Sequence, residues 1–137
     1  MTKKEVYVIA VFLIVLLILL GCNNSSMYIL KNEVVDIDSI EIVSASSCYD
    51  YTTLKTLSQT EMDEFLVEFS KIEFSQYIIG DPMSVSGDCI KINYKNGSYE
   101  IICHYWAEYV ENETVNNIRK NCDEEEFNRL LLSFLDD

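Results

Sequence analysis

Five cysteines and a single histidine are the most reactive side chains in this 137-residue chain. Cys22 lies near the N-terminus, and the other four are Cys48, Cys89, Cys103 and Cys122. A thiol can act as a nucleophile, bind a metal or form a disulfide, and each of these uses requires particular neighbours. The spacing of these cysteines is therefore the first guide to chemistry.

A cysteine–histidine pair is the first arrangement to consider, because His104 could act as a base for Cys89. Such a catalytic pair usually needs a third residue that orients the base, and no residue is marked for that role. A zinc site needs three or four ligands, and the chain has no C-x₂-C or H-x₃-H spacing. Calcium-binding, phosphate-binding and G-x-S-x-G motifs are absent as well. We expect no catalytic residue, no metal and no cofactor.

A β-hairpin is predicted around the dipeptide Asn96-Gly97, because strand-like runs lie on both sides of it. Asn-Gly between two such runs is typical of a two-residue type I′ turn. That turn would place Cys89 opposite His104. It would also direct Cys103 to the opposite, apolar face of the sheet, which should meet the core.

The same register limits the possible disulfides among the four later cysteines. It argues against a Cys89–Cys103 bond, because the two side chains would project from opposite faces. Two pairings remain open, namely Cys48–Cys89 with Cys103–Cys122, and Cys48–Cys103 with Cys89–Cys122. A third interpretation, that all four are small buried thiols, also stays open.

The second face of the predicted hairpin carries His104 and Trp106, and we expect it to be partly solvated. Tryptophan is favoured in recognition surfaces because it combines a large apolar ring with a hydrogen-bond donor. Trp106 is therefore the best candidate for a contact residue, and His104 is interpreted as a neighbouring sheet-surface residue.

The N-terminal segment has the features of an export signal. Lys3 and Lys4 precede an uninterrupted apolar run of 15 residues, which ends before Gly21 and Cys22. A membrane-spanning helix needs about 20 apolar residues, so the run is short for a span and fits the apolar region of a secretory signal.

Leu19-Leu20-Gly21-Cys22 resembles the lipobox of bacterial lipoproteins, and the chain as a whole looks like the small lipoproteins of Gram-positive-type bacteria. The resemblance implies that a diacylglycerol is attached to the Cys22 thiol and that cleavage occurs between Gly21 and Cys22. Leu20 departs from the family pattern, in which this residue is more often small or β-branched. The resemblance also implies a lipid anchor on the outer face of the cytoplasmic membrane, which two acyl chains can hold stably. An uncleaved N-terminal anchor helix is the alternative.

The acidity of the chain belongs to the part after the signal. The whole chain has 23 acidic and 10 basic residues, a net charge of −13. Residues 1–21 hold two lysines and one glutamate, so the remaining 116 residues carry a net charge of −14. Nucleic acid is excluded as a partner, because binding phosphates requires a basic surface.

Periodic patterns predict an α+β domain. Its fold is expected to be a small antiparallel sheet of three to four strands, with two amphipathic helices packed on one face. The chain divides into a signal peptide (1–21), a lipidated cysteine with its tether (22–32) and a single domain (33–137). The expected elements are a strand over 34–45, a helix over 59–71 capped by Ser58 and Glu61, an extended segment over 73–79, the hairpin over 88–106, a strand over 114–120 and a final helix capped by Asp123.

Three functions are consistent with these features. The first is a membrane-anchored, non-catalytic binding domain whose acidity favours a basic protein or peptide. The second is an inhibitor or immunity-type lipoprotein that neutralises a basic secreted protein. The third and least favoured is a thiol enzyme that uses Cys89 and His104.

Overall fold

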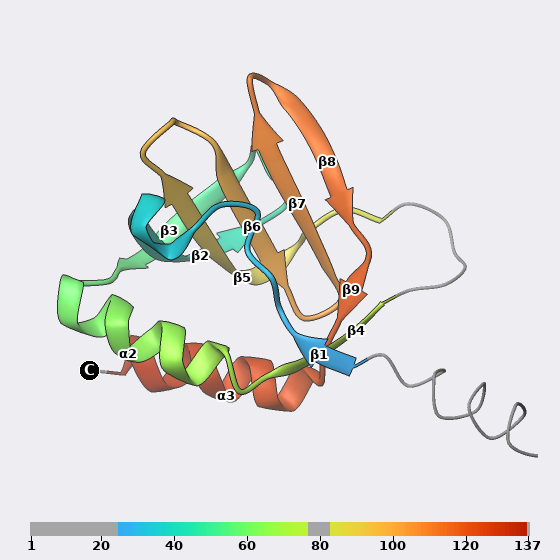
Figure 1. Ribbon diagram of the computed structural model, residues 1–137. Coiled ribbons are helices and arrows are strands. Elements are labelled where there is room, and N and C mark those ends of the chain that lie inside the picture. The colour runs from blue at the N-terminus through green and yellow to red at the C-terminus, as the bar shows by residue number, and fades with distance from the viewer. Residues whose placement is uncertain (1–24, 77–82, 137) are drawn as a thin grey trace, which may run out of the picture.

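The computed structural model describes residues 25–76 and 83–136, which form an α+β fold with two helices and two antiparallel sheets. Figure 1 shows the helices together below a curled sheet. The elements are β1 (Ser25–Met27), a 3₁₀ turn (Val34–Asp36), β2 (Ile37–Ala45), β3 (Tyr51–Thr56), α2 (Gln59–Phe69), β4 (Glu73–Gln76), β5 (Gly87–Tyr94), β6 (Tyr99–Cys103), β7 (Trp106–Glu111), β8 (Thr114–Ile118), β9 (Lys120–Asn121) and α3 (Glu124–Leu135).

The α+β class with two helices is confirmed, but the sheet is larger than predicted. One sheet has six strands in the order β3-β2-β5-β6-β7-β8, and the other has three in the order β1-β4-β9. Strands β3 and β7 were not anticipated from the sequence. The prediction of three to four strands was therefore too small.

Both helices begin where the sequence predicts, because their caps are local. The Ser58 Oγ accepts a hydrogen bond of 3.3 Å from the Glu61 N–H, and the Glu61 carboxylate accepts one of 2.7 Å from the Ser58 N–H. The Asp123 carboxylate accepts a 2.8 Å hydrogen bond from the N–H of Glu126 at the start of α3. Each cap satisfies backbone N–H groups that a helix N-terminus otherwise leaves free.

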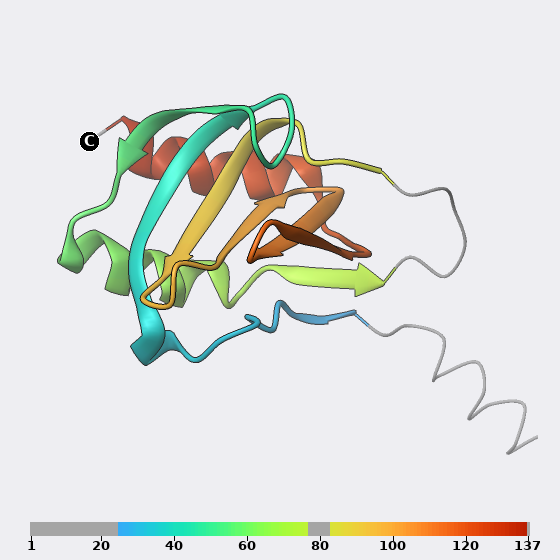
Figure 2. The same cartoon turned by 90° about the horizontal axis from the view of Figure 1, so that it is seen from above.

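The main core lies between the helices and one face of the six-stranded sheet (Figures 1 and 2). The rings of Phe65 on α2 and Phe134 on α3 meet edge to face, with centroids 5.4 Å apart. Isoleucines of the central strands pack against this aromatic layer, including Ile42, Ile90 and Ile102, which are fully buried. The amphipathic stripes predicted from the sequence thus face the sheet as expected.

The other face of the sheet holds a second core, which corrects the prediction of a partly solvated face. Its buried residues include three cysteines and Trp106. The curl of the sheet closes this face. The hydroxyl of Tyr49, after β2, donates a 3.0 Å hydrogen bond to the carbonyl oxygen of Glu113 in the β7–β8 turn, and the hydroxyl of Tyr99 donates one of 2.8 Å to the carbonyl oxygen of Cys48.

The β5–β6 hairpin has a three-residue loop, so its predicted register is wrong by one residue. The N–H of Tyr94 donates to the carbonyl oxygen of Ser98, and the N–H of Gly97 donates to that of Tyr94, both at 2.9 Å. Gly97 has a φ of +86°, as expected for a type I turn followed by a bulge residue in the left-handed region. Because the side-chain period of a strand is two, the shift moves every β6 side chain to the other face relative to β5.

The type I′ turn occurs two hairpins later, between β7 and β8. Asn112 and Glu113 have φ values of 49° and 64°, the two positive angles that this turn requires. Glutamate rarely adopts this conformation, so the sequence does not mark the turn as Asn-Gly would.

Part of the predicted tether packs against the domain. Strand β1 pairs with β4, and Tyr28 is buried against Phe69 and Phe74. The backbone N–H of Lys31 donates a hydrogen bond to the carboxylate of Glu100 on β6. Residues 25–32 therefore belong to the folded body.

Candidate functional site

Three of the cysteines meet in the second core. Cys48 lies in the β2–β3 connection, Cys89 on β5 and Cys103 on β6. Cys122 follows β9 and packs against the helix-covered core on the other side of the sheet. Cys89 lies opposite Cys103 in the observed register, so the structure brings together the pair that the predicted register argued against.

The Cys89 and Cys103 thiols are deeply buried and interact directly. Hydrogen bonding to the Cys89 thiol, aided by backbone groups such as that of Tyr105, lowers the pKa of Cys103 against the opposing effect of burial. Hydrogen bonding to Cys103 and burial raise the pKa of Cys89. Cys89 and Cys103 are 0% and 1% exposed, so neither thiol is accessible to a substrate in the folded domain.

A buried cation lies in the same face of the sheet. The Nζ of Lys91 lies 3.2 Å from the carboxylate of Glu41 on β2. It also lies 4.8 Å from the ring centroids of Tyr51 and Tyr99, which form a cation–π sandwich. The Glu41 carboxylate accepts hydrogen bonds from Asn93 and Thr53 as well as from Lys91. Burial alone would raise the pKa of Glu41, but these hydrogen bonds outweigh it and lower the pKa. Such a complete set of partners indicates a structural ion pair.

The third thiol of this face is held in the protonated form. Burial, followed by a hydrogen bond and repulsion from the Glu108 carboxylate, raises the pKa of Cys48 to about 12. A thiol with so high a pKa is a poor nucleophile at neutral pH.

Cys89 and His104 do not form a pair. His104 lies in the two-residue turn between β6 and β7, and its Nε2 is 3.8 Å from the carboxylate of Glu124 at the start of α3. Its carbonyl oxygen accepts a 2.7 Å hydrogen bond from the N–H of Cys122. The predicted position of His104 on the face of a strand was wrong because β6 ends at Cys103 and the chain turns there to begin β7 at Trp106.

Trp106 is 2% exposed, so it is not the surface contact residue that the sequence predicted. It does share a face with Cys89, but that face is closed by the curl of the sheet. Its indole ring contributes to packing in the second core.

The expected lipidation site lies outside the described residues, since neither Gly21 nor Cys22 is among them. Within residues 25–76 and 83–136, no helix is long and apolar enough to cross a membrane. No group of three or more histidine, cysteine, aspartate or glutamate side chains in that same part of the chain could hold a metal ion.

The outer surface of the two helices is strongly acidic. Residues 58–71 and 123–136 together contain nine acidic and two basic residues, a net charge of −7. We call this the helix surface. Its acidic residues are Glu61, Asp63, Glu64, Glu68, Asp123, Glu124, Glu125, Glu126 and Asp136.

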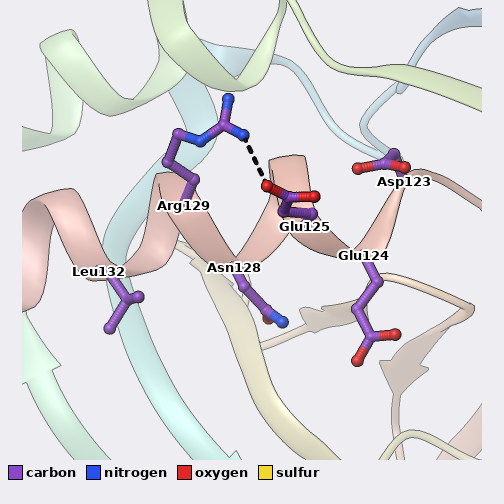
Figure 3. A pocket seen from close by; sticks show the side chains of 6 residues that line it. All are labelled: Asp123, Glu124, Glu125, Asn128, Arg129 and Leu132. Atoms are coloured by element: carbon purple, nitrogen blue, oxygen red, sulfur yellow. Dashed lines mark hydrogen bonds and ion pairs between the residues drawn. The ribbon is translucent and has the colours of Figure 1, made fainter.

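Two depressions mark the helix surface. A groove of about 320 Å³ runs between the helices, with Glu68 and Lys71 on one side and Glu126 and Arg129 on the other. A shallower hollow lies on α3 (Figure 3), where Arg129 pairs with Glu125 at 3.3 Å. Figure 3 shows Glu124, Asn128 and Leu132 projecting from the other side of the helix.

The burial of charged side chains on the sheet could not be predicted from the sequence. Lys91 stands between two isoleucines and Glu100 between Tyr99 and Ile101, so each looks like a solvent-facing residue of an alternating strand. Only the three-dimensional register, with a layer covering each face, shows that these side chains are buried.

Comparisons of the chain with protein-family models, with curated proteins and with solved structures find no match.

Proposed function

We propose that this protein is a lipid-anchored, extracytoplasmic binding domain that recognises a basic protein or peptide through its helix surface. The anchor would be a diacylated Cys22 in the outer leaflet of the cytoplasmic membrane. The proposal for the anchor is supported by the sequence of residues 1–22, and the proposal for the partner is supported by the distribution of charge.

The observation that carries the partner proposal is the concentration of charge on one surface. The helix surface holds a net charge of −7, about half of the −14 carried by residues 22–137. A single-sign surface attracts oppositely charged partners and raises their association rate. The exposed side chains of Val67 and Leu132 on the same helices could supply apolar contact within this acidic field.

The arrangement of the reactive residues supports a binding role over a catalytic one. Cys89 faces Cys103, His104 faces Glu124, and Cys48 is held protonated beside Glu108. Each of these groups is explained by its structural partner.

The anchor is tested by metabolic labelling of the full chain with a radiolabelled fatty acid in a bacterium that processes lipoproteins. We expect label on the wild type and none on the Cys22→Ser variant, with Cys48→Ser retaining the label as the matched control. An unlabelled wild-type protein would contradict the anchor.

The partner is tested by capture on the full chain held in lipid nanodiscs, with secreted and envelope fractions as the source. A helix-surface variant carries Asp63→Asn, Glu64→Gln and Glu124→Gln. A control variant with the same net charge carries Glu33→Gln, Asp38→Asn and Glu111→Gln, which lie elsewhere on the surface. A true partner is basic, is recovered less at high salt, and is lost with the helix-surface variant alone. Equal losses with both variants would contradict recognition by the helix surface.

An inhibitor or immunity-type role is a narrower form of the same proposal. The exposed Val67 and Leu132 favour a protein partner, because interfaces with proteins combine apolar contact with a polar rim. The two forms differ in one measurement. An inhibitor abolishes the activity of the captured partner, whereas a simple receptor leaves that activity unchanged.

A further inference from the structure

We propose that Cys89 and Cys103 form a cross-strand disulfide when the chain folds in the presence of a disulfide oxidant, while Cys48 and Cys122 remain thiols. This inference goes beyond the proposed function and does not depend on the lipid anchor or on the partner.

The first support is the position of the two residues in the ladder between β5 and β6. Ile90 pairs with Ile102 and Asn93 with Tyr99, so one further step along the ladder places Cys89 opposite Cys103. The two side chains therefore leave the sheet from neighbouring points on the same face.

The second support is the type of pair. Tyr94 and Ser98 close the hairpin loop with a backbone hydrogen bond. Hydrogen-bonded and non-hydrogen-bonded pairs alternate along an antiparallel ladder, so the fifth pair beyond this one, Cys89 and Cys103, is non-hydrogen-bonded. Such pairs have Cα atoms about 4.5 Å apart, which lies within the range that a disulfide spans.

The third support is the surroundings of the thiols. Cys89 and Cys103 are 0% and 1% exposed, and their thiols donate to the carbonyl oxygens of Gly87 at 3.3 Å and Trp106 at 3.1 Å, while each thiol also shifts the pKa of the other. Cys48 is directed instead to the Glu108 carboxylate, and Cys122 packs in the core on the opposite side of the sheet. Among the described residues, Cys48 and Cys122 therefore lie in cores on opposite sides of the sheet and cannot bond to each other.

The covalent step balances with any small-molecule or protein disulfide as the oxidant. The thiolate of one of the two cysteines attacks one sulfur of the oxidant, forming a mixed disulfide and releasing one thiol. The other cysteine then loses its proton and attacks the sulfur of the first cysteine, which releases the second thiol. The two cysteines lose two hydrogens in total, and the oxidant gains both. Because the folded pair is buried, the step takes place while the hairpin is forming.

The test is to unfold and reduce the purified full chain, refold it in a mixture of oxidised and reduced glutathione, quench with acid and alkylate the free thiols. Cleavage after lysine and arginine then puts each cysteine in a different peptide, and mass spectrometry identifies the linked pair. These peptides are residues 5–31, 32–55, 72–91, 96–119 and 121–129, which hold Cys22, Cys48, Cys89, Cys103 and Cys122 in that order.

We expect peptide 72–91 linked to peptide 96–119, with Cys48 and Cys122 alkylated. The Cys48→Ser variant should keep that link, and the Cys103→Ser variant should lose it. Alkylation of both Cys89 and Cys103 in the refolded wild type, or a link that involves Cys48 or Cys122, would overturn the proposal. The same peptide mapping on protein exported by cells shows whether the bond also forms in the cell. The refolding experiment needs no export, so a failure of export and a failure of the pairing give different results.

Discussion

The backbone N–H of Lys31 donates a hydrogen bond to the carboxylate of Glu100, 69 residues later in the chain. Glu100 is fully buried on β6, on the face that the helices cover, and the hydroxyl of Tyr94 donates to the same carboxylate at 3.1 Å. This one buried carboxylate thus connects the N-terminal segment to the centre of the six-stranded sheet.

The first prediction concerns the pH dependence of that contact. Burial raises the pKa of Glu100 above its usual value, against the lowering effect of hydrogen bonds from the Lys31 N–H and the Tyr94 hydroxyl. A raised acid pKa means that the folded state binds the proton more tightly than the unfolded state. The stability gained from this group is therefore complete below the unfolded pKa and is lost as pH rises through the folded pKa.

The Glu100→Gln variant should remove this loss, because glutamine keeps an acceptor oxygen and carries no charge. Thermal unfolding followed from pH 4 to pH 8 should show a variant that gains on the wild type as pH rises. The exposed Glu111→Gln on β7 is the control and should track the wild type. A Glu100→Gln protein that loses the same stability at every pH would refute this explanation.

The second prediction concerns the ion pair in the second core. The Lys91→Met variant keeps most of the side-chain volume but leaves the Glu41 carboxylate with only its neutral donors. We expect a loss of about 1–3 kcal/mol in the free energy of unfolding, measured with urea. The matched control is Lys71→Met, which breaks an exposed pair with Glu68 and should cost less than about 0.5 kcal/mol. Equal costs for the two substitutions would count against a structural role for Lys91.

The third prediction contrasts two turns. Gly97→Ala should destabilise the protein by about 1 kcal/mol, because an alanine at a φ of +86° is strained even though its Cβ would meet no atom within 4 Å. Glu113→Gly in the type I′ turn should instead stabilise it by roughly 0.5–1 kcal/mol, because glycine relieves the strain of a positive φ. Urea unfolding of both variants measures the two signs. A neutral Gly97→Ala would disprove the bulged turn.

The fourth prediction concerns the capping box of α2. Ser58→Ala should cost about 1 kcal/mol, because it leaves the N–H of Glu61 without its acceptor. Thr60→Ala, one residue into the exposed first turn, is the control and should change stability by less than about 0.5 kcal/mol. The check is urea unfolding followed by far-ultraviolet circular dichroism.

The helices could be predicted from the sequence because their signals are local. A capping box or N-cap aspartate and an apolar stripe lie within a dozen residues of each other, and both survive in the structure at Ser58 and Asp123. Strand β3 was missed because it lies at the edge of its sheet, and its exposed Thr52, Thr53 and Leu54 show no apolar alternation.

The hairpin register could not be predicted because two turns require the same residues. Both the type I′ turn and the type I turn with a bulge need a positive φ at the position of Gly97. The type I′ turn needs one at Asn96 as well, which asparagine tolerates, so Asn96-Gly97 fits either turn. In the bulged turn the Asn96 side chain accepts a 2.9 Å hydrogen bond from the N–H of Ser98. Which of the two turns forms depends on whether Tyr94 pairs with Ser98, and contacts between residues far apart in the sequence decide that pairing.

The one-residue difference between the predicted and the observed register of β5 and β6 determined most of the candidate site. It turned Cys103 to the same face as Cys89 and reversed which pairs of thiols could meet. The burial of Trp106 was beyond the sequence for a different reason, since it depends on the curl of the sheet that brings Tyr49 to Glu113.

The docked N-terminal segment also sets how far the protein could reach from a bilayer. Ser25, the first residue of β1, is three residues after Cys22 in the sequence. Three residues of chain span at most about 11 Å even when fully extended. A domain held by lipids on Cys22 would therefore lie almost on the membrane surface, and its partners would have to be met within that thin layer.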